Sequence, residues 1–378
     1  MINPYNFVKA IKNNKINFVT GVPDSLLKNL TNCISDNLKK NHIISTNEGS
    51  ALALAIGHYL ATKSPGIVYM QNSGLGNIIN PVTSLAHPYV YGIPVILLVG
   101  WRGELLSENK QVEDEPQHKK QGQITIKQLK LLDIPIKIIN KRTKNIKLIL
   151  NNLKKLSIKK QTPVAIVVRK NTFAKYNQKK IKKIKQNALY REEIINEIVS
   201  LSSNKQIILS TTGMASRELF EIREKKNQKT FKDFLTVGGM GHVSQIAAGV
   251  AMNKKNKKII CIDGDGSLLM HMGSLGISSK LKNIIHILIN NKSHDSVGGQ
   301  PTLGEFIDFT KISKACGYKS NILIKNKKKI RSTIKKALKN KNNSFLQINC
   351  EKGYRNNLGR PDKNIKKRKD LFIKHLNY

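Results

Sequence analysis

Residues 259–293 constrain the fold most, because their pattern predicts a complete strand–helix–strand unit. Two short apolar runs, 259–262 and 284–289, have the length of buried strands, and residues 267–280 between them have apolar side chains at helical spacing. A crossover helix makes the two strands parallel, so the loops that follow them lie at the same edge of the sheet. Ligands of open α/β sheets bind at this edge.

The two loops carry residues that suit a metal-bound diphosphate. The first contains Gly264, Asp265, Gly266 and Ser267, and the second contains Asn291. Glycine lets the backbone approach a ligand closely, and Ser267 with the helix start offers donors to a phosphate. Asp265 and Asn291 offer the oxygen ligands that Mg²⁺ prefers. The alternative is two ordinary turns, because Asp-Gly pairs are common in turns.

The rest of the chain repeats this alternation of strand-like and helix-like runs. It predicts an α/β protein with two doubly wound parallel sheets. We expect a first domain at residues 1–173, a basic linker at 174–188, a second domain at 189–355 and a basic tail at 356–378. From residue 363 the tail is expected to be a frayed helix or disordered.

The charge is extreme: 66 Lys and Arg residues against 24 Asp and Glu residues give a net charge of +42. A nucleic-acid or anionic-membrane partner is one interpretation. However, lysine is abundant together with Asn and Ile throughout the chain, and the two lysine-rich segments lack interleaved aromatic residues for base stacking. We therefore expect no nucleic-acid or membrane partner, and a basic field that would attract a dianionic substrate.

The cysteine pattern and the lengths of the apolar runs indicate the cellular compartment of the protein. Four cysteines are scattered without metal-binding spacing, which is typical of a reducing compartment. No charged-then-apolar leader opens the chain, and no apolar run reaches the length of a membrane span. These features predict a cytoplasmic protein.

The Gly-Asp-Gly loop and the Asn-Asn loop, with strand–helix–strand between them, resemble the cofactor fingerprint of thiamine-diphosphate enzymes. The resemblance implies thiamine diphosphate and Mg²⁺ as cofactors, with Asp265, Asn291 and Ser293 as metal ligands. It also implies that Glu48, in the segment NEGSALALA, hydrogen-bonds the aminopyrimidine ring. The other interpretation of Glu48 is a carboxylate that complements a helix N-terminus.

Two further strand-to-helix loops fit the same resemblance. In this family a bulky apolar side chain lies under the bent cofactor, which matches Met240, and a nearby backbone carbonyl matches Gly238. The competing interpretation is a dinucleotide loop, Gly239-x-Gly241-x-x-Ser244, but its last glycine is missing. The other loop, residues 211–213, predicts diphosphate donors at Thr211, Thr212 and Gly213, or a simple helix cap.

Longer segments, including TGVPDSLLK, VGWRGE and NNKSHDSVGGQPT, resemble those of the phosphonopyruvate decarboxylase family over nearly the whole chain, including the lack of a middle domain. Sulfopyruvate decarboxylases share many of these motifs and are the alternative. The resemblance implies a carbon–carbon lyase that converts phosphonopyruvate, a small 2-oxo acid, in phosphonate biosynthesis, and a homo-oligomer of at least two chains.

The remaining candidate residues follow predicted strands and loops. The catalytic candidates besides Glu48 are Asp24, His118 and His294; either histidine is the candidate general acid or a buried structural residue. Arg102 could bind a phosphonate with its bidentate fork or be an ordinary surface arginine. The other substrate-binding candidates are Ser25, Gln71, Asn72 and Lys292.

Overall fold

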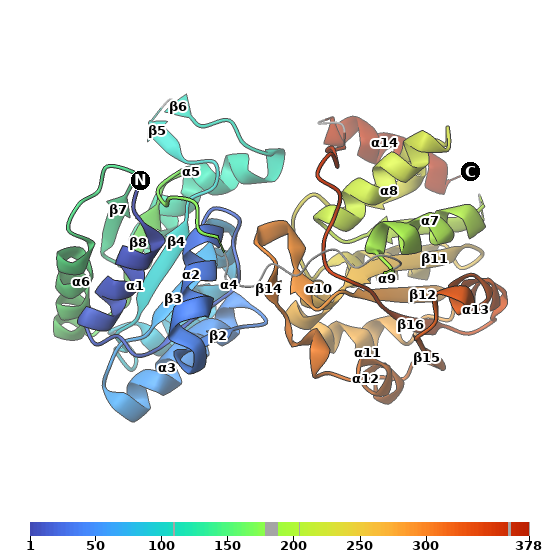
Figure 1. The fold of residues 1–378 in the computed structure, drawn as a ribbon. Helices are drawn as coiled ribbons and strands as arrows, with labels where there is room; N and C mark the ends of the chain where they lie inside the picture. Colours follow the sequence, from blue (N-terminus) through green and yellow to red (C-terminus); the bar gives the residue numbers. More distant parts are fainter. Residues whose placement is uncertain (109, 178–187, 204, 362–363, 378) are drawn as a thin grey trace. The chain divides into compact units, whose positions relative to one another are not determined.

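The computed structural model describes every residue except 109, 178–187, 204, 362, 363 and 378, and the chain divides into two compact units, residues 1–183 and 184–378. Each unit is built on one six-stranded sheet (Figure 1). The predicted class, two doubly wound α/β sheets without a middle domain, is confirmed. The predicted linker at 174–188 lies mostly outside the described residues.

The first unit alternates strands and helices along the chain. Its helices and strands are α1 (Pro4–Asn13), β1 (Val19–Gly21), α2 (Lys28–Leu38), β2 (His42–Ile44), α3 (Glu48–Thr62), β3 (Ile67–Gln71), α4 (Leu75–Pro81), β4 (Ile96–Gly100), β5 (Leu105–Ser107), β6 (Lys110–Gln111), α5 (Pro116–Leu131), β7 (Ile136–Ile139), α6 (Ile146–Lys160) and β8 (Val164–Val168).

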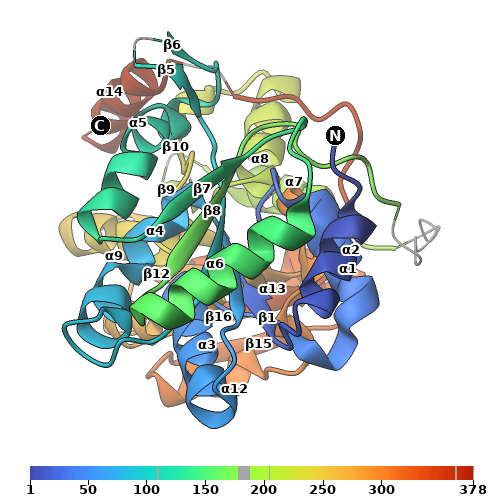
Figure 2. The same ribbon diagram turned by 90° about the vertical axis from the view of Figure 1, so that its left-hand side faces the viewer.

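The strands of the first sheet run parallel in the order β2-β1-β3-β4-β8-β7. Helices cover both faces, so the central strands β4 and β8 are buried at every residue and read as continuous apolar runs. Helices α1, α2 and α6 pack on one face, as Figure 2 shows, and α3, α4 and α5 on the other. The chain order reverses between β1 and β3, and the loops after these two strands are where sheets of this topology bind ligands.

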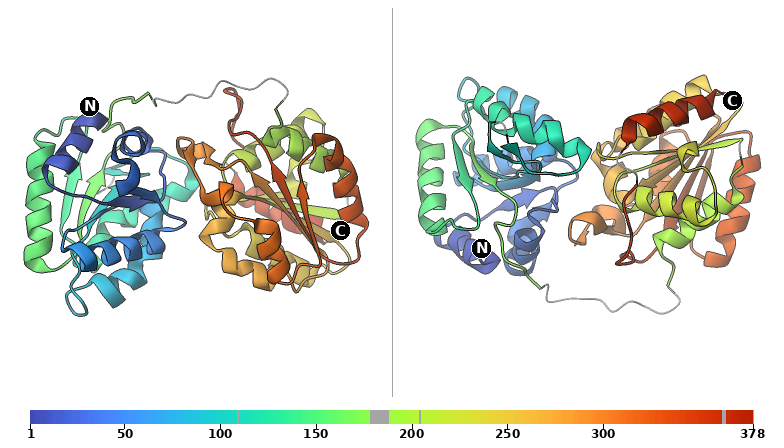
Figure 3. Two further views of the ribbon diagram at one scale, coloured as in Figure 1. Left: turned by 60° about the horizontal axis from the view of Figure 1, so that its bottom comes forward. Right: turned by 90° about the horizontal axis from the view of Figure 1, so that it is seen from above.

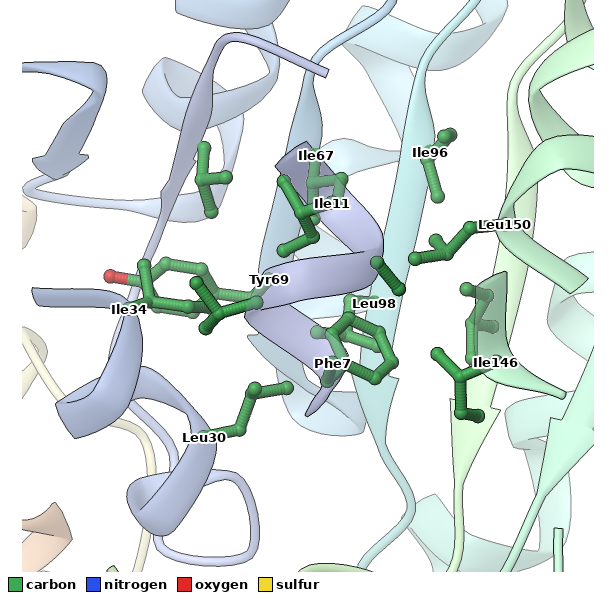
Figure 4. Packing of buried hydrophobic residues seen from close by; sticks show 14 of the residues in the cluster. Phe7, Ile11, Leu30, Ile34, Ile67, Tyr69, Ile96, Leu98, Ile146 and Leu150 are labelled. Atoms are coloured by element: carbon green, nitrogen blue, oxygen red, sulfur yellow. The ribbon is translucent and has the colours of Figure 1, made fainter. Parts of the chain in front are cut away.

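Helix α1 anchors the first core. Asn3 caps it by accepting a hydrogen bond from the Tyr5 N–H at 2.9 Å, and Pro4 occupies its first turn. Phe7 and Ile11 point from α1 onto the sheet, where Figure 4 shows them beside Tyr69 and Leu98.

The second unit repeats the alternation. Its helices and strands are α7 (Arg191–Leu201), β9 (Gln206–Ser210), α8 (Met214–Lys225), β10 (Asp233–Leu235), α9 (Val243–Asn253), β11 (Lys258–Gly264), α10 (Asp265–Met270), α11 (Leu275–Ser278), β12 (Ile284–Asn290), β13 (Ser293–His294), β14 (Gln300–Pro301), α12 (Phe309–Ala315), β15 (Ser320–Ile324), α13 (Lys327–Lys339), β16 (Ser344–Asn349) and α14 (Ile365–Leu376).

The second sheet is parallel in the order β10-β9-β11-β12-β16-β15. One apolar cluster packs α7, α8 and α13 against the sheet. A second cluster packs the helices α9, α10, α11 and α12 against it. The reversal of chain order lies between β9 and β11, which is the position equivalent to that in the first sheet. The loops after these strands are therefore the expected ligand-binding loops of the second sheet.

One expectation from the sequence is wrong. The helix expected over 267–280 is broken: α10 ends at Met270, and His271, with φ −140° and ψ 49°, separates it from a short turn and from α11. Of the two alternatives for the tail, the helix is present: α14 packs Phe372 against Phe234 of the edge strand β10. This helix is dark red in the right-hand view of Figure 3. Phe372 is its one buried residue, so its periodic signal among the lysines was weak.

Among the described residues, no helix is both long enough and apolar enough to cross a membrane.

We expect Phe7→Ala to destabilise the first unit by about 3–5 kcal/mol, because Phe7 is fully buried and contacts Phe173 edge to face. The control is Tyr5→Ala on the same helix, since Tyr5 is 55% exposed and its loss should cost less than about 0.5 kcal/mol. Urea unfolding followed by tryptophan fluorescence measures this unit, because the single tryptophan, Trp101, lies in it. Equal midpoints for the two variants would contradict the packing role of Phe7.

Candidate active site

The loops after β9 and β11 are joined by one hydroxyl. Ser267 Oγ accepts hydrogen bonds from Thr211 Oγ1 at 3.0 Å and from the Gly241 N–H at 3.1 Å. Thr212 Oγ1 donates to the Val237 carbonyl at 2.9 Å, which ties the same region to the segment before Gly238. Residues of three separate loops therefore lie together at the carboxyl edge of the second sheet, and two of these loops carry the predicted diphosphate residues.

Gly213 has a structural requirement of its own. It begins α8 with φ +92°, a conformation that favours glycine. The backbone at this loop is consequently fixed as the chain turns from β9 into α8.

Asp265 lies at the start of α10 and is 1% exposed. Burial raises the pKa of Asp265 to about 6, although a hydrogen bond from the Thr302 hydroxyl opposes the shift. A Cβ atom on Gly304 would lie 2.6 Å from Asp265 Oδ2, so only glycine fits against this carboxyl. The Asp265 carboxyl is thus held in place by Thr302 and Gly304, and a bound cation would stabilise its charged form.

Asn291 follows β12 and is oriented by a buried ionic network. Its Nδ2 donates to Asp295 Oδ2 at 2.7 Å, and the same oxygen accepts from Arg191 Nη1 at 3.1 Å. Arg191 also forms a bidentate pair with Glu218 at 2.8 and 3.0 Å. With Nδ2 held by Asp295, the amide oxygen of Asn291 is left on the side of the Ser293 N–H, from which it accepts at 3.1 Å.

The donors at this edge fit a magnesium ion. Asp265 and Asn291 supply a carboxylate and an amide oxygen, which are hard ligands. Ser293 Oγ is buried and has no hydrogen-bond partner among the described residues, so a further oxygen is available to an ion or its water. The fit rests on donor chemistry and on this unsatisfied hydroxyl.

Met240 and His294 meet at Gly266. A Cβ atom at Gly266 would lie 2.8 Å from His294 Cε1 and 3.4 Å from Met240 Cε. Burial lowers the pKa of His294 to about 4, so its imidazole is neutral at pH 7. A neutral imidazole supplies a hydrogen bond there, which makes His294 a weak candidate for a general acid. Lys292 instead pairs with Glu305 at 3.3 Å on the exposed side of the loop.

In the first unit, the predicted residues after β1, β3 and β4 form one group. Asp24 is fully buried, and its Oδ1 accepts from Gln71 Nε2 at 2.8 Å. Burial raises the pKa of Asp24, against which the Gln71 hydrogen bond and the charge of Arg102 act. Asn72 Nδ2 donates to the Arg102 carbonyl at 2.9 Å.

The guanidinium of Arg102 is already engaged within the unit. It forms a bidentate pair with Asp114, 2.7 Å from Nε to Oδ2, and donates from Nη1 to Ser25 Oγ at 2.7 Å. The bidentate edge of the guanidinium, which the sequence predicted would bind a phosphonate, is thus already paired with Asp114. Ser25 and the Nη1 edge are the parts of this group that lie next to Asp24.

Glu48 lies at the first position of α3 and is 5% exposed. Burial raises the pKa of Glu48, opposed by a hydrogen bond from Asn77 Nδ2 at 2.6 Å to Oε2. Asn47, not Glu48, caps α3 by accepting from the Ser50 N–H at 2.8 Å. Gly74 is required beside Glu48, because its Cβ would lie 2.5 Å from the carboxyl.

His118 lies on α5 and is 6% exposed. Its Nε2 is 3.4 Å from Gln117 Nε2, and its backbone carbonyl packs against Gly103 next to Arg102. It therefore lies beside the Arg102 loop.

Several residues of these networks could not be found from the sequence. Arg191 and Glu218 lie in ordinary helical segments, and Arg191 is 104 positions from Asp295. Thr302 and Asp114 look like loop residues. Asp295 carried one local signal, since it follows Asn291 by four positions in the same loop.

Comparison with known proteins gives matches to both units. The family model for the C-terminal TPP binding domain of thiamine pyrophosphate enzymes matches residues 211–348, and that for the N-terminal TPP binding domain matches residues 6–129. Phosphonopyruvate decarboxylase of Streptomyces viridochromogenes is 28% identical over 96% of this chain and 91% of its own length.

Sulfopyruvate decarboxylase of Methanococcus maripaludis has two separate subunits that match. Subunit beta is 37% identical over 40% of this chain and 78% of its own length. Subunit alpha is 36% identical over 42% of this chain and 90% of its own length.

Replacing Asp295 by asparagine should weaken Mg²⁺ binding about 10–100-fold. The neutral amide loses the charged pair with Arg191 and is a weaker acceptor for the Asn291 amide that it orients. The measurement is titration calorimetry of Mg²⁺ into the full chain with thiamine diphosphate present. Asp370→Asn is the matched control, since Asp370 is exposed and pairs with its neighbour Lys369. Equal Mg²⁺ affinities in the two variants would show that Asn291 is oriented without Asp295.

Proposed function

Because this chain belongs to the thiamine pyrophosphate enzymes, we propose that it decarboxylates 3-phosphonopyruvate to phosphonoacetaldehyde and CO₂, with thiamine diphosphate and Mg²⁺ as cofactors. The observation that carries the proposal is the pair of buried strand-end carboxyls, Glu48 in the first unit and Asp265 in the second. The match to a phosphonopyruvate decarboxylase over nearly the whole chain supports the substrate.

The second unit would hold the cofactor. Asp265, Asn291 and Ser293 would bind Mg²⁺, and Thr211, Thr212 and their neighbours would bind the diphosphate. Thiamine diphosphate supplies the electron-accepting centre that allows a 2-oxo acid to lose CO₂. The side chain of Met240, beside Gly266, would support the cofactor from below.

The first unit would handle protons. A carboxyl with a raised pKa stays protonated to higher pH than usual, so Glu48 can donate a hydrogen bond to the aminopyrimidine ring and exchange a proton with it. Asp24 is a second buried carboxyl, within hydrogen-bond distance of Gln71, and is the candidate for a proton relay. With His294 neutral at pH 7, His118 is the remaining histidine candidate for proton delivery.

The phosphonate would meet positive charge near Ser25 and the Nη1 edge of Arg102. Burial lowers the pKa of Arg102, but the hydrogen bond and the charge of Asp114 raise it overall, so the guanidinium stays charged. We infer also that the chain works as a homo-oligomer of at least two copies. The two halves of this chain match separate subunits of sulfopyruvate decarboxylase, which supports a site formed between polypeptides.

Sulfopyruvate decarboxylation is the second candidate. The two sulfopyruvate decarboxylase subunits are each more similar to the parts of this chain that they match than the whole-length phosphonopyruvate decarboxylase is to the chain. A sulfonate carries one negative charge where a phosphonate carries up to two, so the two substrates should differ in their demand for cationic groups.

Glu48→Gln should lower kcat for CO₂ release from phosphonopyruvate by about 10²–10⁴-fold, because the amide keeps the shape of the carboxyl but cannot exchange a proton. Binding of thiamine diphosphate, measured by calorimetry, should change only a few-fold. Glu224→Gln is the control, since Glu224 is exposed on α8. Near-full turnover in Glu48→Gln would exclude the assigned role.

The substrate is decided by kcat/KM for phosphonopyruvate and sulfopyruvate on the same preparation. We expect phosphonopyruvate to be preferred by at least about tenfold, a difference of about 1.4 kcal/mol in transition-state binding. A higher kcat/KM for sulfopyruvate would reassign the substrate while leaving the decarboxylase chemistry in place.

A further inference from the structure

A cluster of three metal-binding residue types lies inside the second unit, on the adjacent strands β11 and β12. Cys261 and Asp263 are two positions apart on β11 and so face the same side of the sheet. His286 on β12 is the register partner of Cys261. All three are at most 2% exposed, and one ligand atom of each lies within 4.8 Å of the others.

The neighbours orient these side chains toward one another. Asp263 Oδ1 accepts from the Gly264 N–H at 2.9 Å, and Oδ2 lies 3.3 Å from His286 Nε2. His286 Nδ1 lies 3.4 Å from the Tyr318 hydroxyl. Metal-binding histidines have this arrangement: one ring nitrogen faces the ion and the other meets a neighbouring polar group.

His286 Nε2 is the unsatisfied atom of the cluster. It is fully buried, yet it makes no hydrogen bond within the described part of the chain, although Asp263 Oδ2 lies 3.3 Å away. A buried polar atom without a partner is costly. An ion placed among Nε2, Oδ2 and the thiol would satisfy it.

The charge of the cluster also favours a divalent cation. Its surroundings are aromatic and apolar, with Phe345 and Tyr318 packed against the imidazole. No Lys or Arg among the described residues forms an ion pair with Asp263. A thiolate, a carboxylate and a neutral imidazole together balance the two positive charges of a zinc ion, so the whole site would be neutral in a low-dielectric interior.

We propose that Cys261, Asp263 and His286 form a zinc site that clamps β11 to β12. The three ligand atoms reach one centre after shifts of about half an ångström, and the bound ion displaces the thiol proton to solvent. A sulfur, nitrogen and oxygen ligand set selects zinc over magnesium. The site is distinct from the oxygen ligands Asp265 and Asn291, and it is independent of the proposed decarboxylation.

The test is the zinc content of the full-length chain, purified without a histidine tag. The protein is loaded with one equivalent of Zn²⁺, dialysed against a weak chelator with excess Mg²⁺, and analysed by inductively coupled plasma mass spectrometry. We expect about one zinc ion per chain, and at least a tenfold loss of retained zinc in Cys261→Ser. Cys316→Ser is the matched control and should retain the ion, as should Asp265→Asn.

Zinc retention that is absent, or equal in Cys261→Ser and in the control, would overturn the proposal and leave a buried ion pair of Asp263 and His286 without a metal. If Cys261→Ser fails to fold, the Co²⁺-substituted wild-type chain decides. A thiolate-to-cobalt charge-transfer band in its absorption spectrum supports the site, and a spectrum without this band refutes it.

Discussion

Carboxyl groups buried at the ends of parallel strands are the feature on which both units depend. Asp24, Glu48 and Asp265 all follow strands, and burial raises the pKa of each. Removing a carboxylate from water costs free energy unless local donors or a cation compensate. Here the donors come from neighbouring loops. A bound cation or a hydrogen bond to a ring nitrogen would stabilise these buried carboxyl groups further. Each sheet supplies this arrangement because the loops that follow its parallel strands lie at its own carboxyl edge.

Each unit orders its strand-end loops with a half-buried or buried arginine. Arg102 joins Asp114 to Ser25 in the first unit, and Arg191 joins Glu218 to Asp295 in the second. A planar guanidinium fixes two directions at once, which a lysine cannot do. In the second unit this rigidity is passed on through Asp295 to Asn291. The two units therefore share a sheet topology but carry different sites, because a different arginine and its carboxylate partners order the loops in each.

The sequence was sufficient where structure depends on local pattern. Buried parallel strands are apolar throughout, so the strands of both sheets and the polar residues that end them were predictable, as the group of Asp24, Gln71 and Asn72 shows. The break at His271 was not, because its neighbours keep helical spacing while its own backbone does not. Nor was the use of the Arg102 fork by Asp114, since pairing in a folded chain depends on distances that spacing does not reveal.

The burial of acidic side chains makes the surface charge differ from the net charge of the composition. Among the described residues, seven acidic side chains are buried, whereas only two of the basic ones, Arg191 and Arg223, are. The surface is consequently even more cationic than the composition suggests. Such a field raises the local concentration of anions and attracts a doubly charged substrate more than a singly charged one, in a salt-dependent way. An excess of lysine that arose from compositional bias can thus still favour a phosphonate at the step of encounter, before any side chain contacts it.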